Sequence, residues 1–446
     1  MDAFLRAALV PRATTHVAGT LDEAEAIRAR YPQVERANIY TAAVLGDAAE
    51  MRAVLDGDAS AATRKGGPFE WEPLLHVCFS RYLRLDPARA DGFERVARML
   101  LEAGADANGG WYEEPYYEGG PKVWESALYG AAGLAQSAGV TRALLEFGAD
   151  PNDGETPYHA PEGYDNTVVE LLLKSGKLSP MSLSWMLCRK ADWHDHDGMK
   201  LVLEHGGDPN VIPRWGNNAL QHAVQRDNGI ETIRMLLERG ADPFLPNAND
   251  GRSAAQMAAR RGRGDFFKLL DERGVDARLS GVDRLAEACA RGDGERVDAV
   301  LRAEPGLREE LLSEGGDLLG AFAGVGNTEG VRCLLDAGVP ADALFGGDAY
   351  FQEARDSTAL HVAAWRGHPE TMQLLIERGT PVNQRDEKGR TAMQLAVKAC
   401  VDSYWKNRRR PEWITVLVDA GASTLGIEVP IGYAEGDEAI RKGSGK

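Results

Sequence analysis

The 446-residue chain has few cysteines, and they are widely separated along the sequence. There are five, and none stands in a CxxC arrangement: Cys78, Cys188, Cys289, Cys333 and Cys400. An odd number of widely spaced cysteines argues against a disulfide framework and against a zinc site built from thiolates. A reducing compartment follows from this, and we predict a cytoplasmic protein.

Long apolar runs and an excess of basic residues are also missing. No stretch of about 18 apolar residues occurs, so we expect no membrane-spanning helix, and the N-terminal segment lacks the basic start and long apolar core of a signal peptide. The 51 Lys and Arg residues are outnumbered by 68 Asp and Glu, which gives a net charge of −17. Negative charge repels phosphate, so neither nucleic acid nor a membrane surface is an expected partner. The charge serves solubility or favours a basic partner.

Signatures of nucleotide binding and of common catalytic sites are absent as well. The sequence contains no GxxxxGK[ST], GxSxG or HExxH motif. We therefore predict no cofactor and no catalytic residue. An enzyme remains an alternative that the sequence does not exclude.

What the chain does contain is an internal repeat. One phrase recurs along the chain, for example as LLEAGADAN at 100–108, LLEFGADPN at 144–152 and VLEHGGDPN at 202–210. It consists of two or three apolar residues, a variable pair, a glycine and a small acidic end. The glycines of the copies serve as anchors: Gly104, Gly148, Gly176, Gly206, Gly240, Gly274, Gly338, Gly379 and Gly421. With one divergent copy near Pro305, the period is roughly 35 residues.

A second phrase precedes each anchor, for example EPLLHVC at 72–78 and SALYGAA at 126–132. The segment TALHVAAWRGHPETMQLLIERGTPVNQRDEKGRTAMQLA at 358–396 resembles one ankyrin repeat running into the next, because the T-P-L-H-x-A phrase and a period near 33 are typical of that family. The resemblance implies an all-α solenoid of stacked helix–turn–helix units with finger loops. We expect about eleven repeats over 37–425, an N-terminal helical cap at 1–36 and a C-terminal tail at 426–446.

Two finger loops are longer than the others. We call residues 108–126 the first finger and residues 342–358 the second finger. The first carries four aromatic residues and three glutamates between paired glycines, and the second carries further aromatic residues and carboxylates. Aromatic side chains on a loop lose little conformational entropy when they dock, so they favour a binding role. The alternative is that each finger folds back and packs on its own solenoid.

The tryptophans favour the same side of the repeats. Trp71, Trp124 and Trp215 align just before the T-P-L-H phrase, on finger positions, and Trp365 follows an alanine pair at a position that the family turns towards its concave groove. The predicted contact residues combine these positions with the aromatic residues of the fingers: Phe79, Trp111, Tyr112, Tyr116, Tyr117, Trp215, Phe345, Tyr350, Phe351 and Trp365. An aromatic groove edged with carboxylates suits a basic segment.

The resulting prediction is a scaffold that binds another protein or peptide, with a basic partner favoured, through an aromatic, acidic concave groove and two long fingers. The alternatives are an enzyme or small-molecule-binding protein with its site in the groove, and a self-assembling structural scaffold. The sequence leaves the partner's identity and the oligomeric state open. The abundance of Ala, Arg and Gly indicates a bacterial source.

We expect most of the histidines to have a structural role. His76, His159 and His361 occupy the T-P-L-H position, where the family uses the imidazole for hydrogen bonds within the turn. His194 and His196 form an HxH pair among carboxylates, which suits a divalent metal, but we predict a polar turn between helices and no metal site. His16 lies in the N-terminal segment, and its sequence context indicates no particular role.

Overall fold

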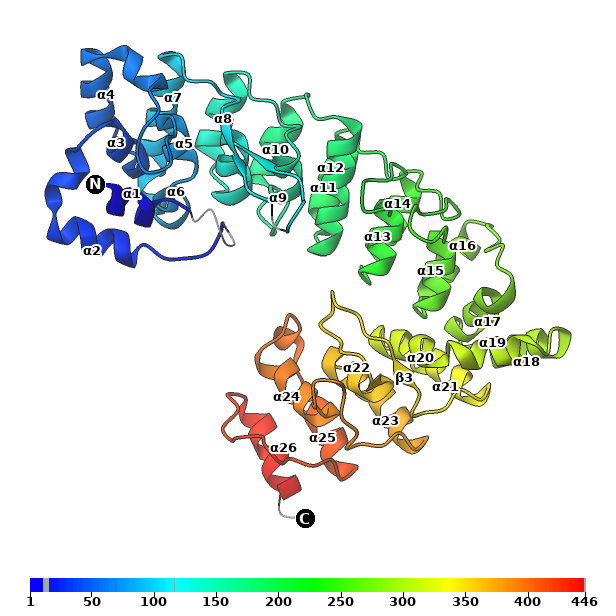
Figure 1. Cartoon of the computed structure of the whole chain (residues 1–446). Helices are drawn as coiled ribbons and strands as arrows, with labels where there is room; N and C mark the ends of the chain where they lie inside the picture. The colour runs from blue at the N-terminus through cyan, green and yellow to red at the C-terminus, as the bar shows by residue number, and fades with distance from the viewer. Residues whose placement is uncertain (11–15, 116, 445–446) are drawn as a thin grey trace. The chain divides into compact units, whose positions relative to one another are not determined.

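Short helices follow one another in pairs along the chain, as the computed structural model shows (Figure 1). The structure describes residues 1–10, 16–115 and 117–444. Its internal contacts divide the chain into an N-terminal unit, Met1–Arg226 with Met235–Ala241, and a C-terminal unit, Asp227–Arg234 with Asp242–Lys446.

The N-terminal unit begins with α1 (Asp2–Ala8), α2 (Asp22–Arg30) and the 3₁₀ helix η1 (Pro32–Arg36). The helices that follow are α3 (Ile39–Leu45), α4 (Ala48–Gly57), η2 (Ala59–Thr63), α5 (Pro73–Cys78), α6 (Arg81–Leu85), η3 (Pro87–Arg89), α7 (Ala90–Glu102), the π-helix η4 (Tyr129–Leu134), α8 (Ala138–Glu146), α9 (Glu155–His159), α10 (Thr167–Lys174), α11 (Pro180–Asp192), α12 (His196–Glu204) and α13 (Ala219–Gln225). Between α7 and η4 lie two strands, β1 (Gly110–Glu113) and β2 (Val123–Ser126).

The C-terminal unit repeats the same arrangement, and α14 (Ile230–Glu238) contributes residues to both units. Its helices are α15 (Ala254–Arg260), α16 (Gly264–Glu272), α17 (Gly281–Ala290), α18 (Gly294–Ala303), α19 (Leu307–Ser313), α20 (Gly315–Gly324), α21 (Thr328–Asp336), α22 (Ala359–Arg366), α23 (Pro369–Glu377), α24 (Ala392–Val401), η5 (Lys406–Arg408), α25 (Glu412–Asp419) and α26 (Ala434–Ser444). Its strands are β3 (Leu344–Phe345) and β4 (Ser357–Thr358). The pair α17 and α18 lies where the divergent repeat near Pro305 is expected.

Side-chain caps start the first helix of several pairs. Capping boxes occur at Asn38, Asn218, Ser253, Thr358 and Thr391. In the box at α22, the backbone N–H of Thr358 donates to Nδ1 of His361 over 3.1 Å, and Nε2 of His361 lies 3.0 Å from the carbonyl oxygen of Gln384. These bonds satisfy backbone groups that the helix itself leaves unpaired. The turn hydrogen bonds that the sequence predicts for His361 are present.

The anchor glycines end the second helix of the pairs. Each of the nine has a positive φ, from 65° at Gly176 to 105° at Gly338. A side chain with a Cβ is strained in this left-handed region, whereas glycine adopts it freely. The recurring glycine in the sequence therefore marks the points where the chain leaves one helix and turns into the next finger.

Small residues let neighbouring pairs stack closely. Ala363 and Ala364 of α22 are fully buried, and α22 contacts α20 on one side and α24 on the other. In α23, Met372 and Leu375 are also fully buried. Since no single pair can bury its own apolar face, the stacked neighbours complete the core. The predicted helical solenoid is confirmed.

An asparagine in each well-formed repeat ties it to the next. The side-chain amides of Asn108, Asn152, Asn210 and Asn383 donate to backbone carbonyl oxygens 25 to 40 residues further on. In three of these, the side-chain oxygen also accepts from a backbone N–H further along the chain: Asn383 at 2.7 Å from Ser423, Asn108 at 2.8 Å from Asp150, and Asn152 at 2.8 Å from Ser179. The asparagine that closes the repeated phrase is thus an inter-repeat bridge.

The two long fingers are β-hairpins, which the sequence does not predict. In the first finger, β1 and β2 pair antiparallel, with Gly110 opposite Ser126 and Glu113 opposite Val123. In the second, β3 and β4 pair over two residues each. The strands are short, and the fold remains helical. Their importance is that they give each finger a fixed inner and outer face.

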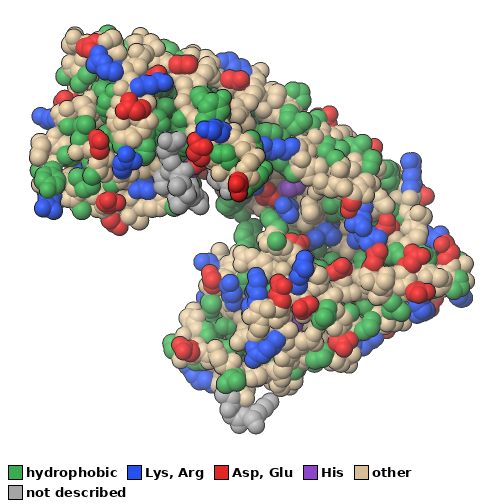
Figure 2. All heavy atoms as spheres, viewed as in Figure 1, with side chains coloured by type: hydrophobic (Ala, Val, Ile, Leu, Met, Phe, Trp, Pro, Cys, Tyr) green, Lys and Arg blue, Asp and Glu red, His purple; other side chains and the backbone are tan. Residues whose placement is uncertain are grey.

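The surface is mixed in charge. Acidic and basic side chains are interspersed over much of the face that Figure 2 shows. Among the described residues, no helix is both long enough and apolar enough to cross a membrane.

Candidate partner-binding site

The side chains of the first finger alternate between a buried face and a more exposed face of the hairpin. Successive residues of a strand point to opposite faces, so Trp111 and Glu113 share one face with Glu125, which lies opposite Trp111 in the pairing. These three side chains are buried, at 6%, 3% and 1% exposure. Tyr112 and Trp124 pair on the other face, where Tyr112 is 58% exposed and Trp124 is half-buried.

The inner face of the first finger packs on the solenoid through aromatic rings. The Trp111 ring lies 5.2 Å from the Trp71 ring, nearly parallel to it, and 5.7 Å from the ring of Phe79, which is fully buried. Phe79 and Trp111 are thus core residues in this structure. They are removed from the expected contact surface, because a partner does not reach a side chain that is already covered.

The second finger is packed down more completely. Phe345, Phe351 and Trp365 are 9%, 6% and 4% exposed, and Tyr350 is half-buried. The indole of Trp365 donates a hydrogen bond to the backbone of Phe351, and the guanidinium carbon of Arg366 lies 3.4 Å from the centroid of the Phe351 ring. The three buried aromatic residues therefore also leave the expected contact surface. The alternative stated above, a finger folded back on its own solenoid, describes this geometry.

A buried ion network holds the second finger in place. Asp227 accepts from Arg261 at 2.7 Å and from Arg366 at 2.8 Å, and Arg366 also donates to Glu353 at 2.7 Å. Burial opposes the charge of Asp227, but the two guanidiniums outweigh it and hold the pKa of that carboxyl at about 2. For Glu353, burial dominates and raises the pKa. The network is internal to the C-terminal unit.

Two predicted residues of the first finger are exposed. Tyr112 lies with its ring 4.7 Å from that of Trp124, and Tyr117 is 68% exposed. Tyr116 lies outside the described residues. The first finger therefore presents aromatic side chains outward, while its inner face is fixed in the core.

Trp215 belongs to a separate aromatic cluster of the N-terminal unit. It is half-buried, and its ring lies 5.9 Å from that of Trp185 and 6.0 Å from that of Tyr158. Arginines cover this cluster, with Arg189 4.3 Å from the Tyr158 ring and Arg214 5.0 Å from the Trp185 ring. Cation–π contacts at these rings are thus already made by the chain itself.

A pocket of about 450 Å³ opens beside the first finger. Its lining comes from the end of one repeat, from β2 and from the start of the next finger: Ala107, Asn108, Trp124, Ser126, Leu128, Asp150 and Asp153. Asp153 accepts hydrogen bonds from Ser126 and from Thr156, and Asp150 is exposed. The pocket thus combines an aromatic wall with two carboxylates. Sequence alignment places Trp124 on the finger side, but nothing in the sequence predicts the pocket.

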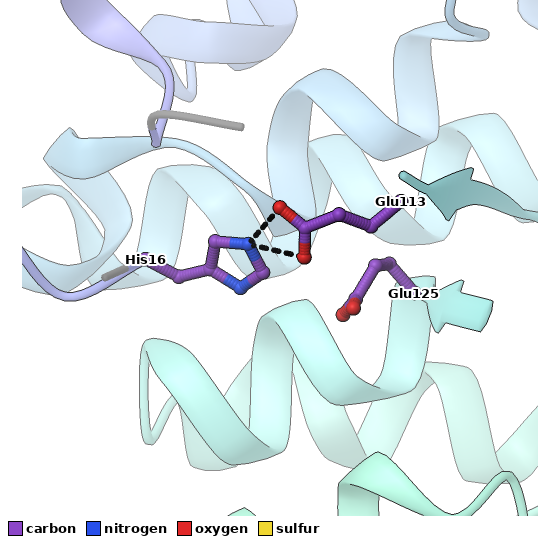
Figure 3. Close-up of side chains that lie close together, drawn as sticks. All are labelled: His16, Glu113 and Glu125. Carbon is purple, nitrogen blue, oxygen red and sulfur yellow. Dashed lines mark hydrogen bonds and ion pairs between the residues drawn. The ribbon is translucent and has the colours of Figure 1, made fainter. Parts of the chain in front are cut away.

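One cluster beneath the first finger has the side chains of a metal site. His16, Glu113 and Glu125 converge there, with one ligand atom from each within 4.8 Å of the others (Figure 3). Nε2 of His16 lies 3.1 Å and 3.2 Å from the two carboxylate oxygens of Glu113. Sequence reasoning missed His16. The short aromatic segments GWYE at 110–113 and VWES at 123–126, read as two strands of a hairpin, are the signal that could have placed the two glutamates together.

The HxH pair lies where α11 ends and α12 begins, at the turn between helices that the sequence predicts. His194 has a positive φ of 53°, and His196 begins α12. Asp195 between them caps this helix by accepting from the N–H of Gly198, and it pairs with Nζ of the fully buried Lys190 over 2.9 Å. The neighbouring carboxylate is thus engaged in the structure of the turn.

Comparison with known proteins identifies the family to which the repeats are similar. The family model described as ankyrin repeats matches residues 186–280, 285–386 and 340–423, which together are more than half of the chain. Among curated proteins, an ankyrin repeat and KH domain-containing protein of Caenorhabditis elegans is 28% identical over 201 residues, covering 44% of this chain and 7% of the relative. The E3 ubiquitin-protein ligase KEG of Arabidopsis thaliana is 25% identical over 352 residues, covering 73% of this chain and 21% of the relative.

The chain therefore spans less than a quarter of the length of these relatives. Among solved structures, the human ASB11 ankyrin repeat domain is 21% identical over 52% of this chain and 96% of that domain, with a TM-score of 0.24.

Proposed function

The chain belongs to the ankyrin-repeat family, and on that premise we propose that it binds a basic segment of a partner protein through its first finger. Ankyrin repeats are protein-interaction modules. The observation that carries the proposal is the pocket beside the finger, whose lining includes Trp124, Asp150 and Asp153.

The outer face of the first finger is suited to recognition. Its inner face is fixed by Trp111 against Trp71, so Tyr112 and Trp124 sit on a hairpin that is already ordered. A preorganised surface loses little conformational entropy on binding. Large exposed aromatic side chains supply contact area at low entropic cost, which supports a binding role for Tyr112 and Tyr117.

The charge of the site selects for cations. Between residues 109 and 126 the chain has four glutamates and a single basic residue, Lys122, which pairs with Glu114 over 2.8 Å. A lysine or arginine side chain in the pocket would meet the aromatic face of Trp124 and the carboxylate of Asp150. A cation–π contact of this kind is worth about 0.5–2 kcal/mol, and a charge contact with an exposed carboxylate about 0–1 kcal/mol. An acidic segment would be repelled.

A peptide array tests the proposal. The labelled full-length chain is applied to peptides that differ only in having Lys and Arg, Gln, or Glu at matched positions. We expect selective capture of the basic peptides, weakening at higher salt. Capture should fall at least about tenfold in Trp124→Ala, which corresponds to losing one desolvated cation–π contact and its ring packing.

Tyr404→Ala is the matched control, because Tyr404 is 62% exposed and belongs to the C-terminal unit. It should bind like the unmodified chain. Equal capture of basic and acidic peptides would contradict the proposal, and so would a Trp124→Ala variant that binds basic peptides as well as the control.

A further inference from the structure

We propose that His16, Glu113 and Glu125 bind a divalent metal ion of the zinc type, which clamps the N-terminal segment to the first finger. His16 lies between α1 and α2, whereas the two glutamates lie on β1 and β2, about a hundred positions further along the chain. The three side chains point towards one another in Figure 3. This proposal does not depend on the function proposed above.

Burial makes the cluster costly without a cation. The three residues are 6%, 3% and 1% exposed. Within the described part of the chain, Glu125 forms no ion pair with a lysine or arginine, and Glu113 pairs with the imidazole of His16. Two carboxylates that share a desolvated site repel each other and are stabilised by a counter-ion. A dication supplies that charge at the point where their oxygens converge.

The second observation in favour of a metal ion is a carboxylate oxygen of Glu125 that is unpartnered in the part of the chain that the structure describes. Its Oε2 atom is buried and has no hydrogen-bond partner among the described residues. Buried carboxylate oxygens are normally hydrogen-bonded or bound to a cation, and an orphaned one calls for an explanation. Since the side chain is 1% exposed and its carboxylate is directed towards His16 and Glu113 (Figure 3), a metal ion among the three would occupy this unused acceptor.

His16 is oriented for metal binding by its other nitrogen. Nδ1 lies 2.9 Å from the hydroxyl of Tyr129, while Nε2 faces the glutamates. When Nδ1–H donates to the Tyr129 oxygen, Nε2 keeps its lone pair for a metal. Metal-binding histidines are commonly fixed in this way by a hydrogen bond on the opposite nitrogen. The ring of Trp111, 6.1 Å from that of His16, covers the site from the hairpin side.

The ligand types select the metal. An imidazole with two carboxylates suits Zn²⁺, which accepts nitrogen and oxygen ligands in a tetrahedral arrangement with a fourth position left for water. Mg²⁺ and Ca²⁺ prefer sites made only of oxygen ligands, so the imidazole disfavours them.

The alternative to a bound metal ion is a proton on the carboxyl group of Glu125. Without a metal, burial, and then the charges of Glu155 and Glu113, raise the pKa of Glu125 to about 8. The protonated carboxyl would then be neutral at pH 7 and would have no need of a cation. Glu125→Gln separates the two cases, because glutamine has the shape of the protonated acid but binds metal poorly.

Titration of the folded, chelator-treated full-length chain with Zn²⁺ tests the proposal. We expect one ion per chain, a higher unfolding temperature with zinc, and visible absorption bands when Co²⁺ replaces it. Affinity should fall more than about tenfold in both His16→Gln and Glu125→Gln. Glu114→Gln and His196→Gln are the matched controls, since Glu114 is exposed on the same hairpin and His196 belongs to the HxH pair. Both should bind like the unmodified chain.

Circular dichroism of each variant shows whether it is folded, and having two independent ligand variants keeps the test valid if one of them unfolds. Substoichiometric or weaker than micromolar zinc binding overturns the proposal. It is also overturned if His16→Gln and Glu125→Gln bind zinc like the controls, or if Mg²⁺ at equal concentration displaces the zinc.

Discussion

The indole Nε1 of Trp365 donates a 2.6 Å hydrogen bond to the backbone carbonyl oxygen of Phe351. This bond joins α22 to the tip of the second finger, and the adjacent Arg366 stacks on the Phe351 ring. The second finger is thus part of the core of its unit. The first finger differs because its strands direct one aromatic face inward and the other, with Tyr112 and Trp124, outward.

The ion network under the second finger should be a large contributor to stability. Arg366→Gln leaves Asp227 and Glu353 with one fewer charged partner in a buried site, and breaking such a pair costs about 3–5 kcal/mol. Urea unfolding followed by tryptophan fluorescence measures the loss, with Trp365 beside the network as a local reporter. Arg410→Gln is the control, because its contact with Glu370 is exposed and 3.7 Å long. It should change stability by less than about 0.5 kcal/mol. Equal unfolding midpoints for the two variants would contradict this account.

His159 should make stability depend on pH. Its Nε2 and Nδ1 lie 3.2 Å and 3.0 Å from carboxylate oxygens of Glu155 and Glu162. Burial opposes the charged imidazole, but the two glutamates outweigh it and raise its pKa to about 9. A raised folded-state pKa stabilises the fold fully below the unfolded value near 6.5, and this contribution disappears as pH rises through 9.

The comparison is between the unmodified chain and His159→Gln, each unfolded in urea from pH 6 to pH 10. We expect a difference of up to about 3 kcal/mol at pH 6 that shrinks towards pH 9. A chelator is present throughout, so that metal binding at the neighbouring cluster does not contribute. A difference that stays constant over this range would show that the imidazole is not charged in the folded state.

The anchor glycines give a prediction about backbone conformation. Gly379 has a φ of 90°, and apart from the glycine itself and its two chain neighbours no heavy atom of the described structure lies within 4 Å of where a Cβ would be placed. Gly379→Ala therefore costs about 1–2 kcal/mol through backbone strain, not through a clash. Gly294, in the first turn of α18, has equal space and no positive φ, so Gly294→Ala should stabilise by up to about 1 kcal/mol. Thermal unfolding of the two variants should shift in opposite directions, and a shared direction would rule out the conformational explanation.

These cases show which features can be read from the sequence. A glycine turn and a capping box depend on residues within four positions of each other, so the repeated phrases predict the helical solenoid and its turns. The packing of the fingers depends on contacts such as Trp111 on Trp71 and Arg366 on Asp227, which join positions 40 and 139 residues apart. Aromatic residues in a loop have the same composition whether they face a partner or the core. The strand alternation of the first finger decides between these outcomes, because it directs Trp111 inward and Tyr112 outward.

His16 shows the same limit for the candidate metal site. Ninety-seven residues separate it from Glu113, and a single histidine in an N-terminal segment carries no spacing pattern. The HxH pair at 194 and 196 has the more suggestive spacing, yet the carboxylate between its two histidines caps a helix and pairs with a buried lysine. Spacing along the chain is thus a weak guide where ligands come from different elements.

The two faces of the first finger should separate stability from recognition. Trp111→Ala removes a buried ring that packs on Trp71 and Phe79, and loss of such a ring costs about 3–5 kcal/mol. Trp124→Ala removes a half-buried ring that lines the pocket, so its stability cost should be smaller, about 1–2 kcal/mol, while the affinity for basic peptides should fall about tenfold. Urea unfolding and peptide binding are measured on both variants. If Trp124→Ala loses as much stability as Trp111→Ala, the outer face of the hairpin is structural, and the exposed aromatic residues owe their position to folding. If it loses affinity alone, strand alternation has divided one loop into an anchor and a binding surface.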